Sequence, residues 1–390
     1  MPHMRISKLV LFWMVGAFVG AASSQADERL WLDAQINGRP ARLIFDTGTD
    51  RVILFANGAA RLGLRATPPA LDSPPGPGEA AAGVTEPCDL ALFRTTIRTA
   101  LDVVMMPASI HLRADGAIGW HPVSKHVVRI DATSLTATFL PELPAEIGTW
   151  LQFGIRTNSG YLFLLVPDQH RTNAAVLVDT GFSGGVALAP ENWRGWQAAH
   201  AHQPTTLDSY FMPGAGLVVK QEMWAPELAL GSLSLTDVPV TEANTAEVAL
   251  GGDGYQASIG LTALKRLDLI VDGEHGVAYL RHRSTPPPAY DYNRIGAVFV
   301  PPDLEHDQLT AHVFIPSPAS EAGIRDGDVL LKIDSLEVTR WRTTPGILPL
   351  SRFWAQPAGT RLDLTLKRRG ALYRTSVVLR DILRPPDKMT

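Results

Sequence analysis

Short runs in which apolar and polar residues alternate dominate this chain, and they predict a mainly β protein. Strands are expected over 30–36 and 41–45, joined by Asn37-Gly38, a pair typical of a two-residue hairpin turn. The same alternation predicts further strands at 84–104 (two or three), 127–139 (two), 267–271 and 277–280. Helices are expected only in three short segments, at 57–62, 124–126 and 261–267. The 33 glycines and 30 prolines agree with a turn-rich fold.

The first 280 residues carry one pattern twice. An apolar run ends in Asp46-Thr47-Gly48, and a second apolar run ends in Asp179-Thr180-Gly181, 133 residues later. An apolar-Gly segment follows each motif, Ile118-Gly119 in the first copy and Ile259-Gly260 in the second. Because these landmarks keep their order and nearly their spacing, we infer two tandem copies of one unit.

Proline-rich breaks suggest where the domains end. The run Pro286-Pro287-Pro288 is a stiff spacer that cannot join a sheet, and a weaker break lies at 141–146. We therefore expect five segments: a leader over 1–26, the first copy over 27–142, the second over 143–283, a linker over 284–293 and a C-terminal module over 294–383.

The N-terminus is typical of an export signal. Arg5 and Lys8 precede an uncharged, mostly apolar stretch over 9–22, and small residues follow up to Ala26, after which we expect cleavage. We predict an exported protein of a bacterial periplasm, which would be membrane-anchored if the signal were not cleaved. The single cysteine, Cys88, fits an oxidising compartment and allows no intrachain disulfide.

Charge and cysteine content exclude some classes of function. Lysine and arginine number 35 against 39 aspartates and glutamates, which gives a net charge of −4 and argues against nucleic-acid binding. One cysteine cannot build a cysteine-based zinc site, and we expect neither a metal nor a cofactor.

A pair of aspartates held close together can hydrolyse a peptide bond. Two adjacent carboxyl groups share one proton, because like charges so close cannot both ionise. The ionised group takes a proton from water, which attacks the peptide carbonyl, and the protonated group binds the carbonyl oxygen and later protonates the leaving nitrogen. With an Asp-Thr-Gly motif after an apolar strand in both copies, residues 28–282 resemble bilobal aspartic proteases of the retropepsin/pepsin type.

The resemblance implies a fold, an activity and a set of site residues. It implies two tandem retropepsin-like β-barrel lobes, an aspartic endopeptidase that acts on peptides or proteins, and a monomer, because one chain supplies both aspartates. The implied catalytic residues are Asp46 and Asp179. The implied supporting residues are Thr47, Gly48 and Thr49 in the first loop, Thr180 and Gly181 in the second loop, and Ile118, Gly119, Ile259 and Gly260 packed beside them.

The second motif departs from the family pattern. Many members carry Ser, Thr or Ala after the glycine, where Thr49 conforms and Phe182 does not. Phe182 has no hydroxyl for the carboxylate, so the tuning of the second aspartate is open. The segment 210–218 fits an ordinary exposed hairpin better than a flap that covers substrate.

Two other interpretations stay open. The two copies would form a non-catalytic peptide-binding or scaffold protein if the aspartates had lost their activity. Alternatively, 181–185 matches the G-x-S-x-G pattern, which would make Ser183 the nucleophile of a PDZ-containing serine protease with His126 as base and Asp131 or Asp168 behind it. That interpretation leaves the first Asp-Thr-Gly unexplained.

The C-terminal module resembles bacterial PDZ domains. The resemblance rests on 317–334, with strands expected at 362–367 and 373–379. It implies that a C-terminal peptide adds as an extra strand beside Gly296, Ala297, Val298 and Phe299. The other interpretation is a PDZ domain that only packs on the protease body.

Overall fold

The computed structural model describes residues 29–67, 81–105, 114–167, 174–212, 216–286, 288–302, 306–344 and 346–383. The predicted leader, 1–26, lies outside these residues, as do Asp168 and part of the segment 210–218. Within the described ranges, no helix is long and apolar enough to cross a membrane.

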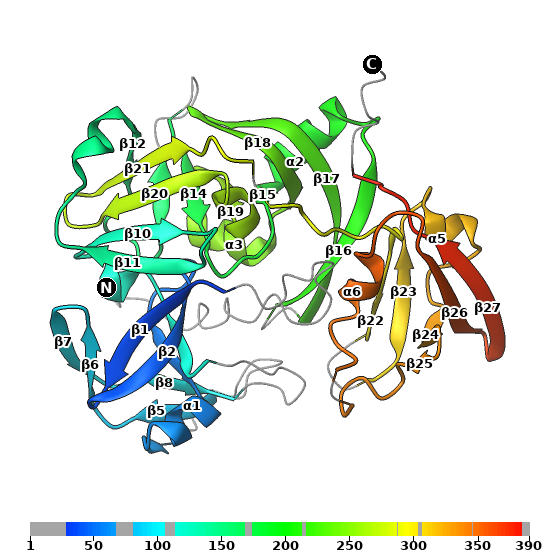
Figure 1. Cartoon of the computed structure of the whole chain (residues 1–390), viewed down its shortest axis with the longest axis horizontal. Helices are drawn as coiled ribbons and strands as arrows, with labels where there is room; N and C mark the ends of the chain where they lie inside the picture. The colour runs from blue at the N-terminus through cyan, green and yellow to red at the C-terminus, as the bar shows by residue number, and fades with distance from the viewer. Residues whose placement is uncertain are drawn as a thin grey trace, which may run out of the picture.

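The chain is mainly β, as predicted, and Figure 1 shows its strands in a body and a smaller C-terminal unit. The first half of the body contains β1 (Trp31–Ile36), β2 (Arg39–Phe45), β3 (Val52–Phe55), α1 (Ala56–Arg61), β4 (Ala66–Thr67), β5 (Ala81–Thr85), β6 (Cys88–Leu92), β7 (Thr95–Thr99), β8 (Asp102–Val104), β9 (Gly116–Ile118), a 3₁₀ helix (His121–Val123), β10 (Val127–Asp131) and β11 (Thr136–Leu140). The second half contains a 3₁₀ helix (Ala145–Thr149), β12 (Leu151–Ile155), β13 (Phe163–Leu165), β14 (Ala175–Val178), β15 (Val186–Leu188), α2 (Pro190–Ala199), β16 (Thr205–Met212), β17 (Gly216–Leu230), β18 (Leu233–Glu242), α3 (Thr245–Gly251), β19 (Tyr255–Ile259), α4 (Leu261–Leu264), β20 (Leu267–Asp272) and β21 (Val277–His282). The C-terminal unit contains β22 (Ala297–Val300), β23 (Leu309–Val313), α5 (Pro318–Glu321), β24 (Val329–Ile333), β25 (Leu336–Glu337), α6 (Ser351–Trp354), β26 (Arg361–Arg368) and β27 (Ala371–Val378).

Local sequence signals were accurate where a turn or an alternation decides the structure. The predicted hairpin forms between β1 and β2, with Asn37 at φ 50° and Gly38 at φ 75°, the left-handed values that its two-residue turn needs. Two predicted helices need correction. The 3₁₀ helix here begins at His121, with Pro122 in its first turn, and ends at Val123, so 124–126 is not helical. The helix expected over 261–267 ends at Leu264, because the chain enters β20 and pairs with β21.

The repeat in the sequence is also a repeat in strand pairing. In the first half, β2 pairs with β9 in parallel, β3 pairs with β9 antiparallel, and β3 pairs with β8 in parallel. In the second half, β14 pairs with β19 in parallel, β15 pairs with β19 antiparallel, and β15 pairs with β18 in parallel. The two halves therefore place their Asp-Thr-Gly loops at equivalent points, at the ends of β2 and β14.

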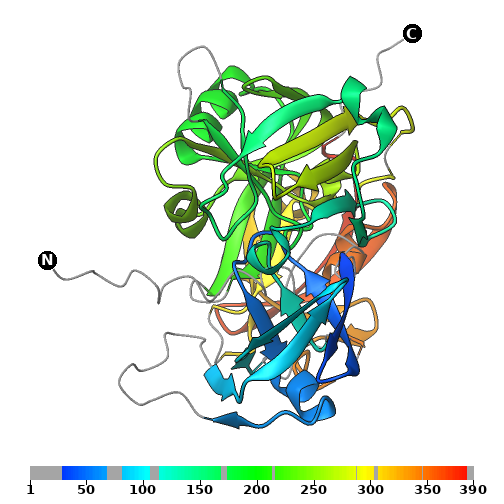
Figure 2. The same ribbon diagram turned by 90° about the vertical axis from the view of Figure 1, so that its left-hand side faces the viewer.

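The two halves are joined through a shared run of strands. β10 of the first half pairs antiparallel with β20 of the second, and the order β11-β10-β20-β21-β12-β13 results (Figure 1). Arg283 strengthens the junction, because its Nη2 lies 2.7 Å from Asp131 Oδ1 and its Nη1 donates to Thr133 Oγ1 at 2.6 Å. Figure 2 shows the two halves one above the other.

The C-terminal unit has its own sheet and its own apolar core. The strand order is β22-β23-β24-β26-β27, with β25 paired to β24 (Figure 1). Ser317 begins α5 through a reciprocal capping pair with Ser320. Asp328, buried behind α5, accepts two hydrogen bonds of 2.7 Å from Arg368 and so ties β26 to this corner.

Asn293 fastens this unit to the long hairpin β16–β17 of the body. It is fully buried, and its Nδ2 donates to Leu207 O on β16 at 2.9 Å and to Ala297 O at 2.8 Å. Its Oδ1 accepts the N–H groups of Ile295 and Gly296, both at 3.0 Å. Thr206 Oγ1 donates to Asn293 O at 2.7 Å. The segment before β22 is therefore bonded to the hairpin and to its own unit at once.

These contacts change the picture of the predicted peptide-binding strand. Gly296, Ala297, Val298 and Phe299 are all buried, and β16 lies beside β22. The N–H of Gly296, which a docking carboxylate would use, already donates to Asn293. β22 is the end strand of its sheet and pairs only with β23, but a peptide carboxylate at Gly296 would first have to displace the Asn293 contact.

Replacing Asn293 tests this attachment. In Asn293→Ala the buried N–H groups of Ile295 and Gly296 lose their acceptor, so the free energy of unfolding should fall by about 3 kcal/mol. Amide hydrogen exchange in β16 and β22 should rise with it. Asn192→Ala is the control, because its amide bonds only to the half-buried Gln256. Equal, small effects from both variants would contradict the role given to Asn293.

Candidate active site

Two parallel strand pairs deliver the two aspartates. Asp46 follows β2, and its N–H donates to Ile118 O on β9 at 2.9 Å; Asp179 follows β14, and its N–H donates to Ile259 O on β19 at 2.9 Å. Each aspartate then opens a tight turn, closed by Thr49 N to Asp46 O at 3.0 Å and by Phe182 N to Asp179 O at 3.2 Å. The apolar strands thus place the two carboxyl groups at equivalent positions in the two halves.

Thr47 and Thr180 bind the two loops to each other. Thr47 Oγ1 donates to Val178 O at 2.6 Å and accepts from Thr180 N at 3.2 Å. Thr180 Oγ1 donates to Phe45 O at 2.7 Å and accepts from Thr47 N at 3.0 Å. Both threonines are fully buried, so each hydroxyl satisfies a donor and an acceptor that water cannot reach.

The two glycines allow the loops to touch. A Cβ added to Gly48 would lie 2.6 Å from Asp179 Oδ1, and a Cβ added to Gly181 would overlap the Asp46 carboxyl group. Each carboxyl group therefore rests against the glycine of the opposite loop. Gly48 N donates to Asp46 Oδ1 and Gly181 N donates to Asp179 Oδ1, both at 2.9 Å, which orients the pair symmetrically.

The apolar-Gly segments support the loops from behind. Ile118 and Ile259 are fully buried. A Cβ on Gly119 would overlap Thr49 O, and a Cβ on Gly260 would lie 2.5 Å from Gly184 O and from the Phe182 ring. The structure thus assembles every residue of the predicted dyad and its supports in one place. Thr49 takes part through its backbone, since its O accepts from Trp120 N at 3.0 Å.

Burial sets the protonation of the pair. Asp46 is only 1% exposed and Asp179 only 4% exposed. Burial raises the pKa of Asp46 to about 6, against the hydrogen bonds from Gly48 and Asp179, which lower it. Burial also raises the pKa of Asp179 well above its ordinary value, and the charge of Asp46 raises it further. Of the two, Asp179 therefore holds its proton more firmly, and Asp46 is the member that ionises first as pH rises.

The structure also gathers several polar side chains near Asp179 that the sequence did not indicate as neighbours of the site. Tyr210 on β16 accepts a hydrogen bond from Asn244 Nδ2 at 3.4 Å, and Lys220 Nζ lies 4.9 Å from the centre of its ring. Lys220 Nζ also lies 3.8 Å from Glu247 Oε2. Burial raises the pKa of Glu247 to about 7. The segment 210–218 does belong to a hairpin, β16–β17, but Tyr210 packs against Asn244 and is half-buried.

The residues of the serine-protease interpretation are not assembled. Ser183 lies in the second aspartate loop, where its O accepts from Thr262 Oγ1 at 2.7 Å. The His126 ring packs on Phe139 of β11, 5.1 Å between centroids, in the first half. Asp131 binds Arg283 at the junction of the halves.

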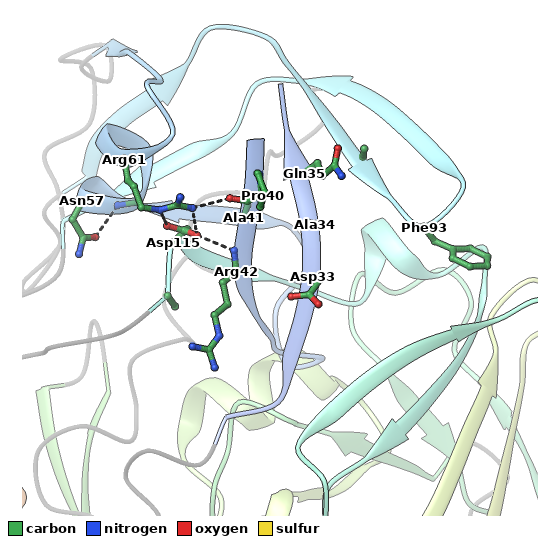
Figure 3. Close-up of a pocket in the computed structure, with 13 residues that line it drawn as sticks. Asp33, Ala34, Gln35, Pro40, Ala41, Arg42, Asn57, Arg61, Phe93 and Asp115 are labelled. Atoms are coloured by element: carbon green, nitrogen blue, oxygen red, sulfur yellow. Dashed lines mark hydrogen bonds and ion pairs between the residues drawn. The ribbon is translucent and has the colours of Figure 1, made fainter. Parts of the chain in front are cut away.

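A hollow among the described residues lies away from the dyad. It measures about 810 Å³ on the outside of the first half, over β1, β2 and α1 (Figure 3). Arg61 spans it and binds both carboxyl oxygens of Asp115 at 2.5 Å. No residue of the aspartate loops is among the described residues that line this hollow.

A comparison with protein families supports an aspartyl-protease likeness over part of the chain. A family model described as aspartyl protease matches residues 32–121, which include Asp46 and Gly119 but not Asp179. No curated protein matches the chain. Solved structures that match include the retroviral protease-like domain of Ddi1 from Leishmania major, with 18% identity over 30% of this chain and 96% of that chain and a TM-score of 0.21. Residues 32–121 are thus similar to aspartyl proteases.

The threonine contacts give a direct test by mutation. Thr47→Val keeps the shape of the side chain but leaves Val178 O and Thr180 N buried without partners, so unfolding free energy should fall by about 3 kcal/mol. Thr138→Val, on the exposed face of β11, should change it by less than about 0.5 kcal/mol. Denaturant unfolding of both variants measures this, and a mild effect of Thr47→Val would contradict the structural role of the contacts.

The raised pKa values predict how stability depends on pH. A carboxyl group whose pKa is higher in the folded state stabilises the fold fully below its unfolded pKa, near 4, and loses this as pH rises through the folded value. The melting temperature should therefore fall from pH 4 to pH 8. Asp179→Asn removes one of the two buried acids, so at pH 8 the variant should be more stable than the native protein, and its melting temperature should fall less from pH 4 to pH 8. Identical pH profiles for both proteins would count against a coupled pair.

Proposed function

We propose that the body is an aspartic endopeptidase that hydrolyses peptide bonds with Asp46 and Asp179. The observation that supports it most is the reciprocal pair of threonine contacts, which holds two buried carboxyl groups against the glycine of the opposite loop. Burying two acids side by side lowers the stability of the fold. It is what a reaction needs when the two carboxyl groups must share one proton.

The proposed reaction assigns a separate task to each carboxyl group. Asp46, the ionised member, takes a proton from a water molecule whose oxygen attacks the substrate carbonyl carbon. Asp179, the protonated member, donates to the carbonyl oxygen, and the tetrahedral intermediate forms. The C–N bond then breaks, and the leaving nitrogen receives the proton that Asp46 took from water. One hydroxyl of the intermediate returns its proton to Asp179 as the new carboxyl group forms, so the dyad again holds one shared proton.

The C-terminal unit is proposed as a PDZ-like module that is attached to the hairpin β16–β17. The N–H of Gly296 already donates to Asn293. We therefore propose that the C-terminal unit, in this arrangement, positions the hairpin rather than holds a free peptide. A C-terminal peptide ligand remains a proposal that requires release of Asn293. We also propose export to a bacterial periplasm, on the basis of the N-terminal sequence, and a monomer that acts on peptide or protein substrates.

Three single variants separate the proposed chemistry from its alternatives. Asp46→Asn and Asp179→Asn should each lower peptide cleavage by at least about 1000-fold, because one carboxyl group cannot serve as both acid and base. Ser183→Ala should keep most of the activity. The measurement is initial rates on a peptide library, with the unfolding midpoint of each variant as the control for folding. Loss of activity in Ser183→Ala with survival of either Asn variant would favour the serine protease, and no cleavage by the native protein would favour a peptide-binding protein.

A further inference from the structure

Tyr161 lies where the second half touches the first aspartate loop. Its neighbour Leu162 donates from N to Thr47 O at 3.2 Å and accepts at its own O from Val178 N at 2.9 Å. Its other neighbour, Gly160, is so close to Asp50 that an added Cβ would lie 2.5 Å from the Asp50 Cβ. The backbone on both sides of Tyr161 thus contacts the aspartate loops, through Thr47 and Asp50 in the first and through Val178 before the second.

The phenol of Tyr161 is buried without a hydrogen-bond partner. The residue is 9% exposed, and Oη is shielded from solvent and unbonded. Four other tyrosines do have partners: Tyr255 bonds to Ser258, Tyr290 to Glu222, Tyr292 to Asp381 and Tyr373 to Ala322. An unpaired buried hydroxyl is unfavourable, so its presence beside the dyad calls for a function.

The surrounding charges decide which kind of group Tyr161 can bind. Burial raises the pKa of Tyr161, and Asp50 and Asp46 raise it further, so the phenol stays protonated and acts as a donor. Arg51 cannot supply a counter-charge for a ligand, because its guanidinium group binds Asp50 at 2.8 Å and Asp102 at 3.3 Å. Two nearby carboxylates disfavour an anionic acceptor. A neutral carbonyl oxygen can accept a hydrogen bond from the phenol and is not repelled by the two carboxylates.

We propose that Tyr161 Oη donates a hydrogen bond to a main-chain carbonyl oxygen of the bound peptide and is a substrate-binding residue of this site. The inference rests on the proposed peptidase function. An extended peptide lying over the dyad presents carbonyl groups at regular intervals along its backbone. One of them would give the phenol the partner that the free protein does not supply.

The test compares Tyr161→Phe with Tyr255→Phe. Both tyrosines belong to the same apolar cluster, but Tyr255 Oη has a partner in Ser258 at 2.8 Å. Tyr161→Phe should raise KM about tenfold, for peptides of every sequence, with kcat unchanged and the urea midpoint the same or higher. Tyr255→Phe should lower the urea midpoint and leave KM unchanged. A structural role for Tyr161 would instead lower its urea midpoint, and an unchanged KM would overturn the inference.

A binding measurement keeps this inference separate from the proposed chemistry. The probe is a peptide in which a secondary alcohol replaces the scissile amide, titrated by calorimetry into the native protein and into Tyr161→Phe. If the native protein binds the probe but cleaves no peptide, the proposed function fails, and a tenfold weaker Kd in Tyr161→Phe still supports the role of Tyr161. An equal Kd overturns it, as does a KM effect confined to peptides with one particular side chain. No binding by the native protein overturns both proposals.

Discussion

The hydrogen bonds between Thr47 and Thr180 are the constraint on which the candidate site depends. Each hydroxyl donates to the carbonyl of the residue directly before the opposite aspartate, Val178 or Phe45, and each accepts the opposite threonine N–H. No water competes for these groups, so the four contacts hold the ends of β2 and β14 in one relative position. Two separate loops become a single rigid platform that carries both carboxyl groups.

That platform is stabilised by strands that lie far from it. β9 and β19 run parallel to the aspartate strands, and β10–β20 pairing joins the halves on another side of the body. The cost of burying Asp46 and Asp179 together is offset by this apolar framework, which contains fully buried residues such as Leu43, Val176 and Val178. Each half contributes one aspartate, so the pair of adjacent carboxyl groups forms only where the two halves meet.

The C-terminal unit is integrated through a polar contact rather than through a shared apolar core. Asn293 uses all its hydrogen-bonding groups between β16, β22 and its own loop. Nearby, Tyr290 Oη donates to the buried Glu222 on β17 at 2.6 Å, and burial raises the pKa of Glu222 to about 8. The hairpin that carries Tyr210 toward the neighbourhood of Asp179 is therefore held from its other side by the C-terminal unit.

The sequence by itself determined the features that depend on neighbours along the chain. Strand alternation, the Asn37-Gly38 turn and the two Asp-Thr-Gly landmarks were readable because short-range sterics and burial of one strand face decide them. The helix limits at Val123 and Leu264 were missed, because Pro122 and the β20–β21 pairing override weak local preferences. Only the tertiary structure decided that the segment 296–299 lies beside β16 and that the Tyr161 hydroxyl is left unpaired. Both depend on surfaces brought together from more than 40 residues apart, and no local pattern encodes which polar group of one segment will face which group of another.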